Sequence, residues 1–120
     1  MTAAVIDRAA LDHLLSVIGG DPEDLAELLE DFLAEAPRLA AKIRESAESE
    51  TWTDLRISAH SLKSNARDFG AMTLSRLCEK LEADCKAGPV ADAVAQADAI
   101  VAAEAEAQAE LRAIKEAGLG

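Results

Sequence analysis

The spacing of its apolar residues limits what this chain can fold into. After Asp21, leucine and phenylalanine recur at intervals of three and four residues, which places them on one face of an α-helix: Leu25, Leu28, Leu29, Phe32 and Leu33. No segment alternates polar and apolar residues for long enough to indicate a β-strand. Alanine, leucine and charged residues with long side chains lose little rotamer freedom in helices. The sequence therefore predicts an all-α protein.

Capping residues divide the first half of the chain into helices. Asp7 can cap a first helix, which the glycines at 19–20 end. The Asp21-Pro22 pair then supplies a cap and a proline at the first position of a second helix. Pro37 removes a backbone donor, so this helix is expected to bend there and to continue to about Ser49.

The second half is expected to contain three more helices. Thr51 with Asp54 resembles a capping box at the start of a third helix, which ends at Gly70. A fourth helix is expected over residues 71–87, and a fifth over residues 90–117.

Short connections between long amphipathic helices favour antiparallel neighbours. We therefore expect an antiparallel up-down four-helix bundle, with the short N-terminal helix covering one end. A chain of 120 residues is long enough for one core, so residues 1–120 are expected to form a single domain. No apolar face is left over for a partner copy, which favours a monomer.

The net charge of −11 argues against nucleic-acid binding and against anionic membranes, because both need a cationic surface. No apolar run approaches the length of a membrane span, and the start of the chain lacks the pattern of a secretory signal. Cys78 and Cys85 lie about two helical turns apart, which is too far for a disulfide. We expect reduced thiols and a cytoplasmic protein.

A histidine stands near the middle of the chain in the segment AHSLKSNARDFGA, at residues 59–71. His60 lies roughly 130° around the third helix from the centre of its apolar stripe, so it is expected to face solvent. Lys63 and Ser64 follow one turn later, and Arg56 and Arg67 lie on the flanks of the same face.

An exposed imidazole among cations suits attack on an anionic electrophile. The cations disfavour the imidazolium form, which leaves a nucleophilic ring nitrogen for a phosphoryl group, and Lys63 can balance charge on the phosphoryl oxygens. The alternative is that His60 is an ordinary surface residue, since histidines beside basic residues are common on helices. No metal site is expected, because His13 and His60 lie on different helices and the cysteines lack a ligand spacing.

Six residues of this segment match the signature of histidine-containing phosphotransfer (HPt) domains, which runs Ala-His-x-Leu-Lys-Gly and ends in Gly-Ala: Ala59, His60, Leu62, Lys63, Gly70 and Ala71. The flanking segments FLAEAPRLAAKIRESAES and LSRLCEKLEADCKAG also resemble the helices on either side of that signature. The resemblance covers about residues 5–115.

The resemblance implies a phosphoryl carrier with no enzymatic activity or cofactor of its own. His60 would accept phosphoryl from a receiver aspartate or a hybrid sensor histidine kinase, and would pass it to a response-regulator receiver domain that supplies the aspartate and Mg²⁺. Lys63 would stabilise the phosphate. Glu82, or otherwise Glu79, would hydrogen-bond the imidazole.

One departure from the family signature is Ser64, which stands where HPt domains usually have glycine. The expected docking surface comprises Arg56, Ser64 and Arg67 with the second-helix residues Leu29 and Leu33. A rival hypothesis is a helical bundle that docks a receiver domain without carrying phosphate. A metal hydrolase is a third alternative, for which the sequence offers no paired catalytic groups.

Overall fold

The computed structural model describes residues 5–119, which form five α-helices and no β-strand. The helices are α1 (Arg8–Val17), α2 (Pro22–Ser49), α3 (Trp52–Asp68), α4 (Met72–Ala87) and α5 (Ala93–Ala117). The all-α prediction is confirmed.

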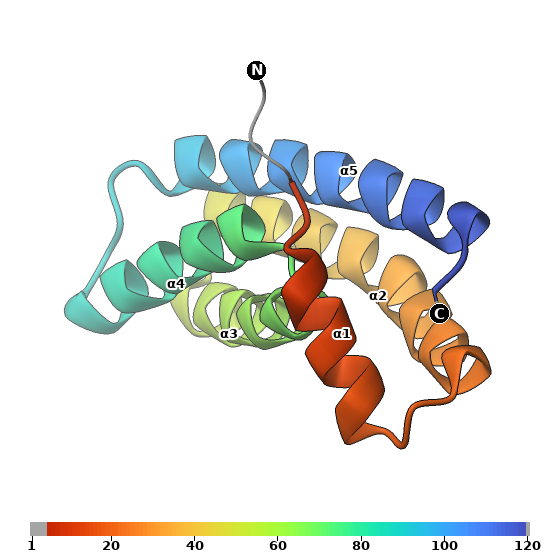
Figure 1. The fold of residues 1–120 in the computed structure, drawn as a ribbon. Helices are drawn as coiled ribbons and strands as arrows, with labels where there is room; N and C mark the ends of the chain where they lie inside the picture. The colour runs from red at the N-terminus through yellow and green to blue at the C-terminus, as the bar shows by residue number, and fades with distance from the viewer. Residues whose placement is uncertain (1–4, 120) are drawn as a thin grey trace.

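The four longer helices form a closed bundle (Figure 1). Helix α2 packs against α3 and α5, and α4 packs against the same two helices from the other side. Helix α1 contacts only α2 and α3, and it lies across one end of the bundle. The predicted four-helix bundle with a short end-covering helix is therefore confirmed. No helix among the described residues is long and apolar enough to cross a membrane.

Helix α2 begins and ends where the sequence predicts. The Asp21 side chain accepts a hydrogen bond from the Glu23 backbone N–H at 2.9 Å, and Pro22 is the first helical residue. Pro37 lies inside the helix without ending it. The helix ends at Ser49, because Glu50 adopts a left-handed conformation with φ of 57°.

The start of α3 differs from the prediction in one respect. Thr51 is the N-cap residue, but its side chain makes no capping hydrogen bond, so the predicted capping box is wrong. The Thr51 hydroxyl instead lies 3.4 Å from the Ser46 carbonyl oxygen and 3.1 Å from the Ser49 hydroxyl. The hydroxyl therefore ties the start of α3 to the end of α2.

The corner between α3 and α4 supports the N-terminal segment. The Asp7 backbone N–H donates to the Gly70 carbonyl oxygen at 2.8 Å. Gly70 has φ of +80°, and a Cβ atom at this position would overlap the Asp7 carbonyl oxygen. Only glycine combines this backbone conformation with so close an approach. The contact fixes the start of α1 against the end of the helix that carries His60.

Both cysteines are buried free thiols on α4. Burial raises the pKa of Cys78 to about 12, with a smaller contribution from the nearby Glu82 carboxylate. A thiol with so high a pKa is unreactive at neutral pH.

Candidate functional site

His60 projects from the solvent-facing side of α3, and 59% of its side chain is exposed. The adjacent Ala59 and the nearby Leu62 are both fully buried, so packing fixes the rotation of the helix around the histidine. One of the two ring nitrogens has a partner in the protein. Its Nδ1 lies 2.7 Å from Oε2 of Glu82 on α4.

Glu82 is a buried carboxylate with 5% of its side chain exposed, and His60 and two lysines lie around it. Its Oε1 lies 2.7 Å from the Lys63 ammonium, and its Oε2 lies 3.6 Å from the Lys86 ammonium. Burial alone would raise the pKa of Glu82, but the hydrogen bonds from Lys63 and His60 lower it to about 2. Glu82 is therefore ionised at neutral pH.

An ionised carboxylate can only accept hydrogen bonds, so Nδ1 of His60 must carry the hydrogen that the two groups share. In the neutral ring, the lone pair then belongs to Nε2. Within residues 5–119, Nε2 has no hydrogen-bond partner. The site consequently presents one nucleophilic nitrogen toward solvent and holds the other nitrogen against the protein.

The carboxylate changes the electrostatics expected from the sequence. The local pattern on α3 suggests an imidazole surrounded only by cations, whereas the structure places a negative charge against Nδ1. Lys63 is held by the same carboxylate, and only 16% of its side chain is exposed. Glu79, the other carboxylate considered for the imidazole, is exposed, and its side chain makes no hydrogen bond among the described residues. Of the two glutamates, Glu82 is the one in contact with the ring.

The residues expected on the docking surface do not all lie on the surface. Arg67 is exposed, and Arg56 and Ser64 are partly exposed. Leu29 and Leu33 are buried, at 0% and 3% exposure, so their assignment to a docking surface is wrong. Both point into the bundle, whereas Leu28, on the same predicted apolar face, is exposed. The exposed apolar side chains of this region are instead Ile57 and Leu28.

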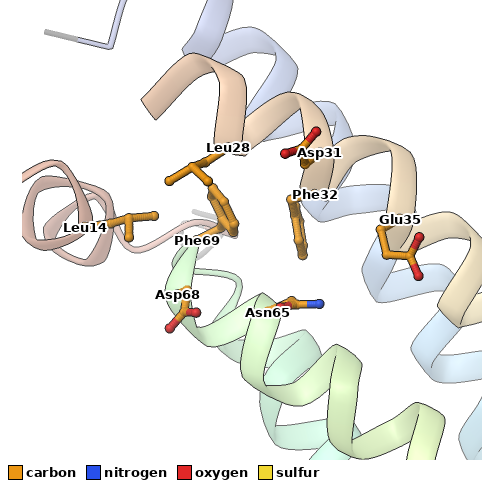
Figure 2. Close-up of a pocket in the computed structure, with 8 residues that line it drawn as sticks. All are labelled: Leu14, Leu28, Asp31, Phe32, Glu35, Asn65, Asp68 and Phe69. Atoms are coloured by element: carbon orange, nitrogen blue, oxygen red, sulfur yellow. The ribbon is translucent and has the colours of Figure 1, made fainter. Parts of the chain in front are cut away.

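A hollow of about 320 Å³ opens between α1, α2 and α3 (Figure 2). Its walls combine apolar side chains with carboxylates, and they comprise Leu14, Leu28, Asp31, Phe32, Glu35, Asn65, Asp68 and Phe69. The rings of Phe32 and Phe69 stack with their centroids 4.8 Å apart. Sequence reasoning missed this hollow because it depends on how α1 meets the other two helices.

Sequence reasoning also missed Lys86. The available signal was its spacing, because Lys86 follows Glu82 by one helical turn and residues four apart on a helix are neighbours. Lys86 is the second lysine that approaches the carboxylate beside His60.

The Hpt domain family model matches residues 27–117, so the chain belongs to the Hpt domain family. It is a histidine phosphotransfer protein of the kind that carries phosphoryl groups in phosphorelays. No curated protein matches the sequence of this chain.

Two solved structures share the fold. Histidine-containing phosphotransfer protein B (HptB) of Pseudomonas aeruginosa PAO1 is 22% identical, with a TM-score of 0.82 over 92% of this chain and 94% of that one. The HPT domain of a sensor hybrid histidine kinase from Shewanella is 19% identical, with a TM-score of 0.72 over 88% of this chain and 93% of that one.

Proposed function

We propose that Nε2 of His60 is the phosphoacceptor of this chain, and that the chain shuttles phosphoryl groups between receiver domains or from a hybrid kinase to a receiver. The observation that carries the proposal is the contact between the exposed imidazole and the ionised, buried Glu82. The contact leaves the lone pair on the nitrogen that a partner can reach.

The geometry supports transfer without movement of a proton. Nε2 attacks the phosphorus of an aspartyl phosphate, the N–P bond forms, and the aspartate leaves with the electron pair of the broken P–O bond. The ring gains a positive charge, which the Nδ1–H group shares with Glu82. Onward transfer reverses these steps. The partner supplies the aspartate and Mg²⁺, so the chain needs no catalytic activity of its own.

Lys63 is proposed to support this step from one turn further along α3. Its ammonium holds Oε1 of Glu82 at 2.7 Å, which fixes the carboxylate that orients the ring. Its charge also makes the potential around His60 less negative, and this favours the approach of an anionic phosphoryl group.

The proposed partner surface is the exposed strip around His60. Ile57 lies one turn before the histidine and is half exposed, and Ser64 and Arg67 follow it on the same face. Leu28 marks the edge of the hollow on the α2 side. Apolar contacts flanked by a cation suit a receiver domain, whose active site is acidic. We further propose a cytoplasmic monomer that comprises a single domain, with receiver domains and hybrid kinases as its partners.

Phosphorylation of a specific histidine tests the proposal. The protein is incubated with a panel of purified receiver domains charged with acetyl phosphate, and in parallel with potassium phosphoramidate. We expect an acid-labile, base-stable phosphoryl group that peptide mass spectrometry maps to His60. His60→Gln should remove it, whereas His13→Gln, which changes the exposed histidine on α1, should not.

Two outcomes would overturn the proposal. Label that persists in His60→Gln would assign the acceptor elsewhere. A wild-type protein that binds receiver domains but takes up no phosphoryl group from either donor would establish the docking-only alternative.

A further inference from the structure

Two lysines approach Glu82, but the carboxylate holds them very differently. Lys63 lies 2.7 Å from Oε1 and is largely buried. Lys86 lies 3.6 Å from Oε2, which is longer than a hydrogen bond, and 62% of its side chain is exposed. Lys63 is therefore held by a short, buried ion pair, whereas Lys86 is exposed and makes only a long one.

The oxygen that Lys86 approaches is also the one bound by Nδ1 of His60. An exposed lysine in this position needs only side-chain rotation to move from the carboxylate toward the outer edge of the imidazole. The same movement by Lys63 would break a short ion pair and would leave Glu82 without its closest cation.

A phosphoryl group on Nε2 would disturb the charge balance of the site. Glu82 and Lys63 neutralise one another, so the pair supplies no net positive charge to a phosphoryl group. A phosphoryl group adds about two negative charges near neutral pH, close to the Glu82 carboxylate. Like-charge repulsion would destabilise the phosphorylated state unless another cation approaches. Lys86 is an exposed cation without a short ion pair, and it already lies beside the carboxylate that holds the ring.

We propose that Lys86 is the phosphate-binding residue of the site, and that it moves from Glu82 to the phosphoryl oxygens when His60 is phosphorylated. Lys63 stays on Glu82 and acts as a positioning residue. This inference rests on the proposed phosphorylation of His60. It predicts that Lys86 controls how tightly the phosphoryl group is retained, while the unphosphorylated site depends mainly on Lys63.

Lys80 provides a matched control for Lys86. It lies on the same helix, 63% of its side chain is exposed, and it pairs with Asp84 rather than with Glu82. Lys86→Gln and Lys80→Gln therefore remove the same charge from equally exposed positions of α4. Lys86→Arg changes the side chain but keeps the positive charge at the proposed site.

The proteins are phosphorylated with potassium phosphoramidate, and the phosphoryl group is titrated by ³¹P NMR without any partner. We expect Lys86→Gln to raise the pKa of the phosphoryl group, because a cation that favours the dianion is lost. The equilibrium of phosphoryl transfer should also shift from the histidine toward the receiver aspartate, by roughly 3- to 10-fold. Lys80→Gln should match the wild type, and Lys86→Arg should restore both quantities.

The ¹⁵N chemical shifts of the unphosphorylated His60 ring separate the two lysines. Lys63→Gln should alter these shifts through Glu82, and Lys86→Gln should change them much less, because its ammonium lies farther from the carboxylate. The inference is overturned if Lys86→Gln behaves as Lys80→Gln does in the phosphorylated protein, or if only Lys63→Gln changes the phosphoryl titration. A wild-type protein without phosphohistidine would instead refute the proposed function itself, so the two failures are distinguishable.

Discussion

Oε2 of Glu82 lies 2.7 Å from Nδ1 of His60, and the pair joins a buried carboxylate on α4 to an exposed imidazole on α3. The two side chains differ in exposure: 59% of the His60 side chain is exposed, against 5% of the Glu82 side chain. The protein interior fixes one nitrogen of the ring, and the other nitrogen faces solvent. Two adjacent helices of the bundle thereby orient the imidazole of the proposed phosphoacceptor.

Removal of the Glu82 charge should slow phosphoryl transfer. In Glu82→Gln, the amide oxygen can still accept from Nδ1, but no negative charge stabilises the ring once Nε2 is phosphorylated. A charge-assisted hydrogen bond contributes about 1.5–3 kcal/mol, so we expect a loss of at least about 10-fold in the transfer rate. Rapid-quench kinetics with a charged receiver domain measure it. Glu79→Gln, at an exposed position of the same helix, is the control and should transfer normally.

The same carboxylate should make stability depend on pH in acid. The pKa of Glu82 is lowered from 4.5 to about 2 in the folded protein, so the unfolded chain binds this proton more readily. The contribution to stability is complete above about pH 4.5 and is lost as the pH falls toward 2. Urea denaturation across this range should give a shallower pH dependence for Glu82→Gln than for the wild type. Parallel curves would contradict the assignment of the ionised state.

The helices could be predicted from the sequence because the signals for them are local. The cap at Asp21 and the apolar spacing of α2 act within a few residues, and both predictions agree with the structure. The family signature likewise marks His60 and Lys63 as the proposed site residues without any knowledge of the fold.

What the sequence could not supply are relationships between helices. The contact of Lys63 with Glu82 depends on the rotation of α4 against α3, and the burial of Leu29 depends on how α2 faces the core. An apolar residue on a predicted helix can be buried or exposed, and its own helix does not decide which. Leu28 and Leu29 are adjacent in the sequence, yet only Leu28 reaches the surface.

Replacing Ser64 with the glycine of the family signature tests how this departure affects docking. It is partly exposed one turn after His60, and glycine there would open space for a partner. We expect Ser64→Gly to keep or raise the rate of transfer to a receiver domain. Glycine inside a helix should lower the free energy of unfolding by roughly 0.5–1 kcal/mol. Reduced transfer by a variant that remains folded would show that the serine hydroxyl assists the reaction.

A second buried carboxylate, Glu104 on α5, should lower stability at neutral pH. Its Oε2 has no hydrogen-bond partner among the described residues, and burial raises its pKa, with a smaller opposing effect from Arg112. The folded protein therefore holds this proton more tightly than the unfolded chain, and stability falls as the pH rises above the ordinary value of 4.5. Glu104→Gln should be more stable than the wild type at pH 7, by about 1 kcal/mol.

This gain should disappear at low pH, where Glu104 is protonated in both states. Urea denaturation at pH 7 and pH 4 gives the comparison, with Glu106→Gln, at an exposed position of α5, as the control. An equal effect of the two substitutions at pH 7 would show that reduced net charge, rather than burial, is the cause.

The contact between Gly70 and Asp7 should make Gly70→Ala strongly destabilising. The alanine would have to adopt φ of +80°, which costs about 1–2 kcal/mol, and its methyl group would overlap the Asp7 carbonyl oxygen. Gly20→Ala separates these effects, because Gly20 has φ of +85° but no atom within 4 Å of the added Cβ. We expect Gly70→Ala to lose at least about 1 kcal/mol more than Gly20→Ala in chemical denaturation. Hydrogen exchange should also show loss of protection at the Asp7 amide in Gly70→Ala alone, since its bond to Gly70 would be broken. Equal losses in the two variants would mean that the N-terminal segment moves aside without cost.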